Sequence, residues 1–554
     1  MDNTHTGNKK MLTNQRTEKR VLRNALLLTT LALTTLSATA KTIRVAKTGT
    51  PDFVKIQDAV DAASSGDRLR IESGVYVENI SLGDKALELF APDGPNSTIV
   101  KPEFDGTAVI RVIASSSTEI SIRGLTIDGV DGANRSSVGI HSSGARLRVE
   151  DCTILNNGDS LSDGGGIYLD WPGRTTIDDV FFYQNMARNG GGLYIINGPF
   201  GPEGLVTVKN STFEKNTGSG YGGGMSTQYT EALIDNCDFT DNSSTEGGGL
   251  YVGPHPQRDV TVNKTTFRDN VSFGDGGGVL IESIILYDED WDDWDFMWEE
   301  WTIIMPLGGI NRYVLLASPN FIDCLSQDNE AASNGGGYAA RHLASFDMEN
   351  CRTQRNNASL GGGGISLCES TGTVTSSKIV KNTADSVGGG VYASNSSELD
   401  MADSKVQKNN AVDGGGLYAE FLSTLIIENT KVVKNIASRD GGGLALSASE
   451  VRFDGGQAKK NSAADQGGGI YALTSSVSFR DAKIDKNIAN DGGGFCFDQS
   501  SGRIMNCKVK GNAKFGARFK SSLVKVKDST LCDNASNDVK GAFNDQGGNK
   551  ICKL

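Results

Sequence analysis

The stretch KNTADSVGGGVYASN, Lys381 to Asn395, sets an asparagine, three consecutive glycines and a tyrosine at fixed distances from one another. Variants of it recur along the chain, for example KNTGSGYGGGMST and KNNAVDGGGLYAE. The three-glycine runs begin at Gly164, Gly190, Gly222, Gly247, Gly276, Gly335, Gly362, Gly388, Gly414, Gly441, Gly467 and Gly492. From Gly335 onward they are 25 to 27 residues apart. A constant period of this length indicates a solenoid in which each repeat is one coil.

Each repeat consists of short segments that alternate apolar and polar residues, as in VTVKNSTF. Such alternation is typical of β-strands with one buried face. No repeat holds an apolar pattern of helical period long enough for an ordinary helix. The sequence therefore predicts parallel strands stacked coil upon coil, with coils of about 26 residues.

An asparagine column is the second feature of the repeat. It precedes most glycine runs and comprises Asn185, Asn216, Asn242, Asn270, Asn382, Asn435, Asn461 and Asn487. Three residues earlier stands an apolar residue, such as Phe213 or Ile379. Buried amides need hydrogen-bond partners, and an identical amide one coil away, at ~4.8 Å, supplies them. We therefore expect a ladder of asparagine amides along the stack.

A column of small residues lies five places before the asparagines. Its members are Cys152, Ser211, Cys237, Thr265, Cys351, Ser377, Ser404, Thr430, Gly456, Ala482 and Cys507. Because Cys237 would lie between Ser211 and Thr265, it has no stacked cysteine to bond. The four cysteines of this column are therefore predicted to be buried free thiols, whereas Cys532 and Cys552 are candidates for a disulfide.

The repeat unit, as in TFEKNTGSGYGGGMS and DFTDNSSTEGGGLY, resembles that of the chlamydial polymorphic outer membrane proteins, over roughly residues 152–534. The resemblance implies a right-handed parallel β-helix, the fold of the pectin-lyase-like superfamily, and a role as a surface adhesin. Those adhesins are displayed by a C-terminal autotransporter barrel. The residues after Asn534 leave no room for one, so display by a barrel is not expected. The fold class predicted is thus all-β, a single-stranded right-handed parallel β-helix solenoid.

The segment TIRVAKTGTPDFVKIQDAVDAASSGDRLRIESGVYVENISL resembles the opening of pectin methylesterases. Thr50 as the N-cap and Pro51 as the first helical residue predict a short helix. Its apolar face would carry Phe53, Ile56 and Val60. Since the end coil of a solenoid exposes an unpaired edge, this helix is expected to cap the N-terminal end.

The chain divides by composition into four parts. Residues 1–40 combine a basic start, the apolar run ALLLTTLALTTL and a small-residue Ala-Thr-Ala site, which is typical of a cleaved export signal. Residues 41–150 are predicted to form the N-terminal cap and first coils. Residues 151–534 form the repeat β-helix, with an insertion at about 284–316, and residues 535–554 form a tail or cap. The sequence therefore predicts a secreted or cell-surface protein whose mature chain has no membrane span.

Charge narrows the choice of partner. The chain has a formal net charge of −13 at pH 7. This balance disfavours nucleic acid and anionic membranes as partners. A monomer that binds polysaccharide or a cell-surface glycan is the favoured interpretation.

The insertion holds four of the five tryptophans, Trp291, Trp294, Trp298 and Trp301, among many acids. Tryptophan rings can stack on sugars, and carboxylates bond hydroxyls or hold calcium. The calcium ligands would be Asp290, Asp292 and Asp293. The four tryptophans also have helical spacing, so an amphipathic lid packed on the solenoid is the first interpretation of the insertion. Binding of a glycan or a basic partner is the second, and a catalytic pair of acids is the third.

A tyrosine column is the second candidate binding surface. The residue after each glycine run is apolar and should point inward, so the next should point outward. It is tyrosine at Tyr168, Tyr194, Tyr251, Tyr392, Tyr418 and Tyr471. Outward tyrosines would form a stacking track for polysaccharide; the alternative is that tyrosine simply favours strands.

No catalytic residues can be assigned from the sequence. The histidine and paired-aspartate motifs of polygalacturonases and the aspartate motif of the esterases are absent, and the mature chain has only three histidines. A binding or adhesive protein that needs no cofactor, with calcium left open, is therefore favoured. A lyase or hydrolase of acidic polysaccharide is the first alternative, and a purely structural surface protein is the second.

Overall fold

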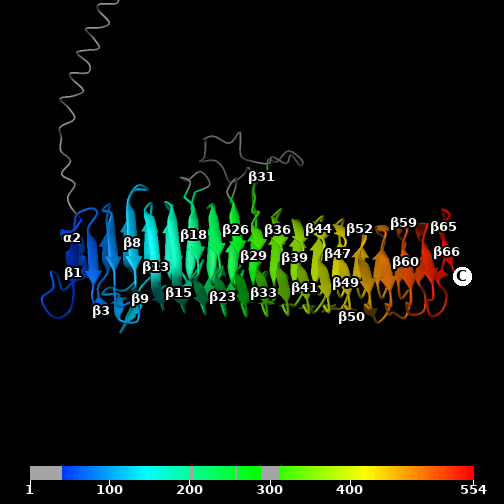
Figure 1. Ribbon diagram of the computed structural model, residues 1–554, viewed down its shortest axis with the longest axis horizontal. Helices are drawn as coiled ribbons and strands as arrows, with labels where there is room; N and C mark the ends of the chain where they lie inside the picture. The colour runs from blue at the N-terminus through cyan, green and yellow to red at the C-terminus, as the bar shows by residue number, and fades with distance from the viewer. Residues whose placement is uncertain (1–39, 199–203, 256–258, 288–311, 554) are drawn as a thin grey trace, which may run out of the picture. The chain divides into compact units, whose positions relative to one another are not determined.

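The computed structural model describes residues 40–198, 204–255, 259–287 and 312–553. The chain separates into two units, Met1–Lys41 and Thr42–Leu554. The second unit is a right-handed parallel β-solenoid whose strands stack coil upon coil along its long axis (Figure 1). The predicted all-β, single-stranded solenoid is confirmed. The predicted export signal lies almost wholly outside the described residues.

One coil shows the plan of all the repeats. It consists of β18 (Val206–Lys209), β19 (Thr212–Glu214), β20 (Thr217–Tyr221) and β21 (Met225–Gln228). Strands β18 and β19 belong to a 35-stranded sheet, here called sheet A. Strand β20 belongs to a ten-stranded sheet, and β21 to a third sheet, here called sheet B. Each strand pairs in parallel with its equivalent in the next coil, as β18 does with β22 (Ala232–Asp235).

The corners between these strands explain the glycine runs. Asn210 and Lys215 turn the chain with φ near 50° on either side of β19, and Gly222 turns it into β21 with φ 67°. The second glycine has another role, because a Cβ on Gly223 would lie 2.4 Å from the carbonyl oxygen of Ser243 in the next coil. One glycine thus supplies the left-handed turn, and the next permits close approach between coils.

The core is a set of stacked inward columns. Phe182, Phe213, Phe239 and Phe267 are fully buried, and their neighbouring rings stack with centroids 4.4 to 5.1 Å apart. The residues after the glycine runs point inward as predicted. They are Leu193, Leu250, Val391, Leu417 and Ile470, all fully buried.

The asparagine ladder is confirmed and is longer than predicted. Asn435 shows its geometry: Nδ2 donates to Oδ1 of Asn461 at 3.1 Å and to the backbone oxygen of Val406 at 3.1 Å. Every predicted asparagine is buried in this ladder. It also includes Asn157, Asn329, Asn356, Asn409, Asn512 and Asn534. At its C-terminal end, Asp538 accepts the Nδ2 proton of Asn534 at 2.8 Å.

The N-terminal helix exists, but its predicted start is wrong. Helix α2 spans Ile56–Ala62, with Lys55 as its N-cap residue. Pro51 does not begin it, because the following residues pair with β1 (Thr42–Val45): the N–H groups of Asp52 and Phe53 both donate to the Arg44 oxygen. The predicted cap at Thr50 is likewise wrong. The carboxylate of Glu78 accepts the N–H groups of Ile56 and Gln57 instead, at 3.1 and 3.0 Å.

The cysteines follow the predicted division. Cys152, Cys237, Cys351 and Cys507 are buried free thiols. Burial raises the pKa of Cys152 and of Cys237 to about 12, so these thiols stay protonated at neutral pH. Cys532 and Cys552 form a disulfide.

The insertion leaves the solenoid through a short antiparallel pair. Strand β30 (Ile284–Tyr287) pairs with β31 (Arg312–Leu315), and the residues between them, 288–311, lie outside the described part of the chain. The tryptophans and acids named above all fall there. They are Trp291, Trp294, Trp298, Trp301, Asp290, Asp292 and Asp293.

Candidate functional site

The predicted tyrosines lie on the outer side of sheet B, in register from coil to coil. Tyr168 pairs with Tyr194, and Tyr392 with Tyr418. The rings of the first pair stack, with centroids 5.5 Å apart and planes at 10°, whereas those of the second pair are tilted by 38° with centroids 6.1 Å apart. Tyr168 and Tyr194 thus turn their ring faces toward each other along the axis, so a ligand beside the sheet would meet their ring edges.

Two of these tyrosines do not reach solvent. Tyr194 is 4% exposed and Tyr251 is 2% exposed. Tyr251 packs with Leu280, Ala339 and Tyr221 in a small cluster outside the main core, and its hydroxyl donates to Glu282 at 3.1 Å. Alternation predicts correctly that these two residues point to the outer side of the sheet. The prediction that they are exposed is wrong, because neighbouring side chains cover them.

An ion-pair network joins the coils on either side of the insertion. It centres on Arg341 in β35 (Tyr338–Arg341), which contacts Glu282 at 2.7 Å, Asp275 at 3.0 Å and Glu246 at 3.3 Å. Burial raises the pKa of Glu246. Because each of these carboxylates already pairs with Arg341, the network holds the coils together and offers no free acid to a ligand.

Free polar groups gather instead on the outer face of sheet A. Two adjoining hollows there, with volumes of about 140 and 470 Å³, share Asp347 and Thr373; together we call them the trough. The strands beneath it are β26 (Val260–Asn263), β32 (Asn320–Ile322), β36 (Ser345–Glu349), β40 (Thr371–Thr375) and β44 (Glu398–Ala402).

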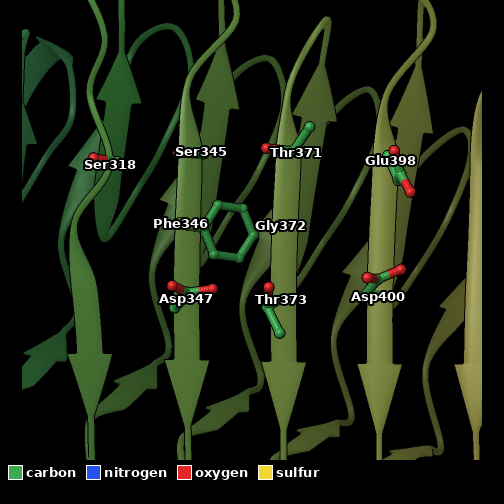
Figure 2. A pocket seen from close by; sticks show the side chains of 9 residues that line it. All are labelled: Ser318, Ser345, Phe346, Asp347, Thr371, Gly372, Thr373, Glu398 and Asp400. Atoms are coloured by element: carbon green, nitrogen blue, oxygen red, sulfur yellow. The ribbon is translucent and has the colours of Figure 1, made fainter.

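The polar side chains of the trough stand in rows, one residue per coil. Asp347, Thr373 and Asp400 form one row across three paired strands (Figure 2). Ser345, Thr371 and Glu398 form a second row beside it. The hollow lies where the short side chains of Ser345, Thr371 and Thr373 stand beside the longer acids.

The floor of the hollow is closely packed. Phe346, in β36, points into the core and is 3% exposed. Its ring fills the space beside Gly372, where a Cβ would lie 2.6 Å from the ring. The rows of polar groups are therefore carried on packed strands rather than on loops, which fixes their spacing.

The acids and threonines of the two rows have side chains without partners. Within the described parts of the chain, Asp347, Glu398 and Asp400 form no ion pair, and the Thr371 and Thr373 hydroxyls form no hydrogen bond. Carboxylates and hydroxyls in this state can accept hydrogen bonds from sugar hydroxyls or contribute oxygen ligands to a cation. The sequence alone does not predict this binding surface. A strand pattern shows which residues point outward, but not which of them find hydrogen-bond or ion-pair partners.

Calcium binding remains a prediction. Among the residues that the structure describes, one group of three potential ligands lies close together, namely Cys532, Cys552 and Asp538. The two cysteines of that group are joined in the disulfide, so their thiolates are not available to a metal.

A family comparison agrees with this architecture. The family described as "Right handed beta helix region" matches residues 138–283 and 389–551, more than half of the chain. The chain therefore belongs to the right-handed β-helix family. No helix among the described residues is long and apolar enough to cross a membrane.

Two curated relatives match parts of the chain. The metabotropic glutamate receptor-like protein R of Dictyostelium discoideum is 32% identical over 26% of this chain and 8% of its own length. The probable autotransporter YfaL of Escherichia coli K12 is 28% identical over 34% of this chain and 16% of its own length. The chain thus spans less than a fifth of either relative.

Solved structures whose backbone follows a similar path include carrot pectin methylesterase and the N-terminal fragment of bacteriophage phi29 gene product 12. The first is 12% identical, covers 56% of this chain and 82% of its own, and has a TM-score of 0.29. The second is 10% identical, covers 89% and 91%, and has a TM-score of 0.30. At these TM-scores neither carries an argument about activity.

Proposed function

We propose that this β-helix is an exported protein that binds polysaccharide along the trough. The observation that carries the proposal is the row Asp347, Thr373 and Asp400, whose side chains are in register and uncommitted. A linear glycan repeats its hydroxyls along its length, and the row repeats its acceptors once per coil, at ~4.8 Å. The match to a protein named as a probable autotransporter supports export.

Replacing both acids of the row should weaken binding. For Asp347→Asn with Asp400→Asn, we expect about 10- to 100-fold lower affinity for a bound polysaccharide, since a hydrogen bond to a charged group is worth about 1.5–3 kcal/mol. The measurement is affinity electrophoresis or a glycan array with the purified protein. The matched control is Asp385→Asn with Asp465→Asn, two exposed acids elsewhere that change the net charge equally. Unaltered binding by the first variant would rule out the trough.

The insertion is the second part of the proposal, because the chain returns from β31 to the solenoid beside the trough. Ser318, which lines the smaller hollow, follows β31 by three residues. Replacing Trp294 and Trp298 by alanine should lower retention on the same polysaccharide about tenfold or more, as expected when aromatic contacts to a ligand are lost. Trp171→Ala is the control, since Trp171 is exposed but lies outside the insertion. Equal retention of the double variant and the control would exclude these tryptophans from the site.

A lyase or hydrolase of acidic polysaccharide is the alternative function. In its favour, Asp347 and Asp400 stand two coils apart with the small Thr373 between them. Two coils are about 10 Å, just above the separation of roughly 6.5–9.5 Å found for the carboxyl pair of inverting glycosidases. Release of reducing ends or unsaturated uronates from the bound polysaccharide distinguishes this enzyme from a binding protein.

A further inference from the structure

A basic surface runs along the second strand of sheet A through seven consecutive coils. These strands are β37 (Arg352–Gln354), β41 (Lys378–Val380), β45 (Lys405–Gln407), β49 (Lys431–Val433), β53 (Gln457–Lys459), β57 (Lys483–Asp485) and β60 (Lys508–Lys510). The basic residues on them and at the corner after each strand, here called the lysine face, are Arg352, Arg355, Lys378, Lys381, Lys405, Lys408, Lys431, Lys434, Lys459, Lys460, Lys483, Lys486, Lys508 and Lys510. Asp485 is the one acid at these positions.

The backbone does not require lysine at the corners of this face. Six corner residues, from Arg355 to Lys486, have φ between 54° and 60°. Asparagine, aspartate and glycine are the residues that suit this left-handed conformation. Earlier coils use them at the same corner, as in Asp241, Asp269 and Asp328. Lysine therefore meets no local conformational need there, and what the six residues share is positive charge.

The strand positions of the face also work against folding. Lys378 stands directly opposite Lys405, and Lys405 opposite Lys431. Like charges directly opposite each other in a sheet are destabilising. Within the described residues, only Arg355 and Lys459 of the lysine face pair with a carboxylate, Asp328 and Asp485 respectively. The other twelve of the fourteen cations have no carboxylate partner among the described residues, so most of the repulsion is not compensated by the protein itself.

An unneutralised row of this kind in a chain of net charge −13 is complementary to an anionic ligand. We propose that the lysine face binds a linear polyanionic polysaccharide, carboxylated or sulfated, laid along the solenoid axis. Two cations are presented per coil, at a rise of ~4.8 Å, which is close to the length of one extended sugar residue. Each charged sugar would then meet a fresh pair of side chains in the next coil.

Three other anionic partners fit the face less well. Single-stranded nucleic acid is bound through aromatic stacking platforms, and no phenylalanine, tyrosine or tryptophan stands at an outward position of these seven strands. Membrane-surface binding adds buried apolar area to basic charge, and the face has only two outward valines, Val380 and Val433. A second copy would have to present acids in register, whereas the equivalent positions of earlier coils mix Asp238 and Asp241 with Lys215 and Arg268.

This inference goes beyond the proposed function, because the lysine face is a different surface from the trough. The two are separated in each coil by a corner, for example at Ser376 with φ 53°. Their tests are independent: neutralising Asp347 and Asp400 removes negative charge and should not weaken the binding of a polyanion.

The experiment measures binding of the full chain to dextran sulfate, with uncharged dextran as the reference. The test variant carries Lys→Asn at five corners, Lys381, Lys408, Lys434, Lys460 and Lys486. Since asparagine suits the left-handed corner, folding should be preserved. We expect about 100-fold weaker binding at low ionic strength and a shallower dependence of log Kd on log salt, because fewer counterions are released.

A matched pair of double variants separates the face from net charge. Lys434→Asn with Lys460→Asn removes two charges from the face, whereas Lys264→Asn with Lys514→Asn removes two from exposed corners elsewhere, with φ 47° and 55°. A loss of affinity in the first pair alone supports the proposal. Equal losses of affinity in both double variants would overturn it, and so would a wild-type protein that does not bind dextran sulfate. Tighter binding to single-stranded DNA or to anionic vesicles at equal charge would overturn it as well. Self-association that disappears in the five-site variant would also overturn it, in favour of a second copy.

Discussion

Replacing Asn435 by alanine is expected to lower the free energy of unfolding by about 4 kcal/mol or more. The Asn435 side chain makes four buried hydrogen bonds. Its Nδ2 donates to Asn461 and Val406, and its Oδ1 accepts from the N–H and the Nδ2 of Asn409 at 2.9 and 3.1 Å. Alanine removes all four bonds, each worth about 1 kcal/mol net, and leaves the Asn409 N–H without its acceptor. Asn461 Oδ1 keeps the backbone N–H of residue 435, and Asn409 Nδ2 keeps the Ile379 oxygen.

The loss should be visible locally as well as globally. In a solenoid each coil contacts only its neighbours, so a broken rung first opens the coils beside it. Hydrogen exchange should therefore lose protection at the amide of Asn409, whose N–H donates to Asn435. Asn410→Ala is the control, because Asn410 is exposed and its side chain lies outside the ladder. If the two variants unfold at the same urea concentration, the ladder does not stabilise the fold as argued here.

The sequence carried most of the fold because the same physical requirement recurs in every coil. A glycine such as Gly222 could be assigned to a turn, and Asn435 to a buried ladder, since each is repeated in register where the neighbouring coil supplies its partner. Periodicity therefore reveals long-range contacts that a single segment would hide. Inward and outward directions followed in the same way from alternation around Leu417 and Tyr418.

Features that depend on contacts made only once in the chain could not be predicted from the repeat. The local signal Thr50–Pro51 is a good helix start, yet pairing of the next residues with β1 moves the start to Ile56. Tyr251 points outward as its alternation predicts, but Tyr221 from another strand packs beside it.

The candidate site was missed for a related reason. Asp347 and Glu282 both stand at outward strand positions, and nothing in their sequence surroundings distinguishes them. Glu282 is neutralised by Arg341, which is 59 residues away, whereas Asp347 has no such partner among the described residues. Which acids remain free is decided by partners that come from other coils, so only the folded chain reveals it.

Replacing Gly415 by alanine tests the close approach of neighbouring coils. Gly415 is the second glycine of its run and does not have a left-handed φ, so backbone strain is not the issue. Its Cβ would lie 2.2 Å from the oxygen and 2.4 Å from the carbon of the Ile436 carbonyl in the next coil. Contacts this short cannot be relieved by rotating a side chain, because both partners are backbone atoms. We expect a loss of about 3 kcal/mol or more, at the upper end of overpacking costs.

The expected structural consequence is a separation of two coils at one corner. The amide of Ile436 donates to the Asn409 oxygen at 2.9 Å, and that of Gly415 to the Gly441 oxygen at 3.2 Å, so both should exchange faster with solvent. Gly83→Ala is the matched control: Gly83 is exposed, has no left-handed φ, and a Cβ there would meet no atom within 4 Å. The urea midpoint should fall for the first variant alone. If Gly415→Ala unfolds at the same urea concentration as the control, neighbouring coils are not close enough to require a glycine at this position. The three-glycine run would then recur only because its first residue makes the left-handed turn.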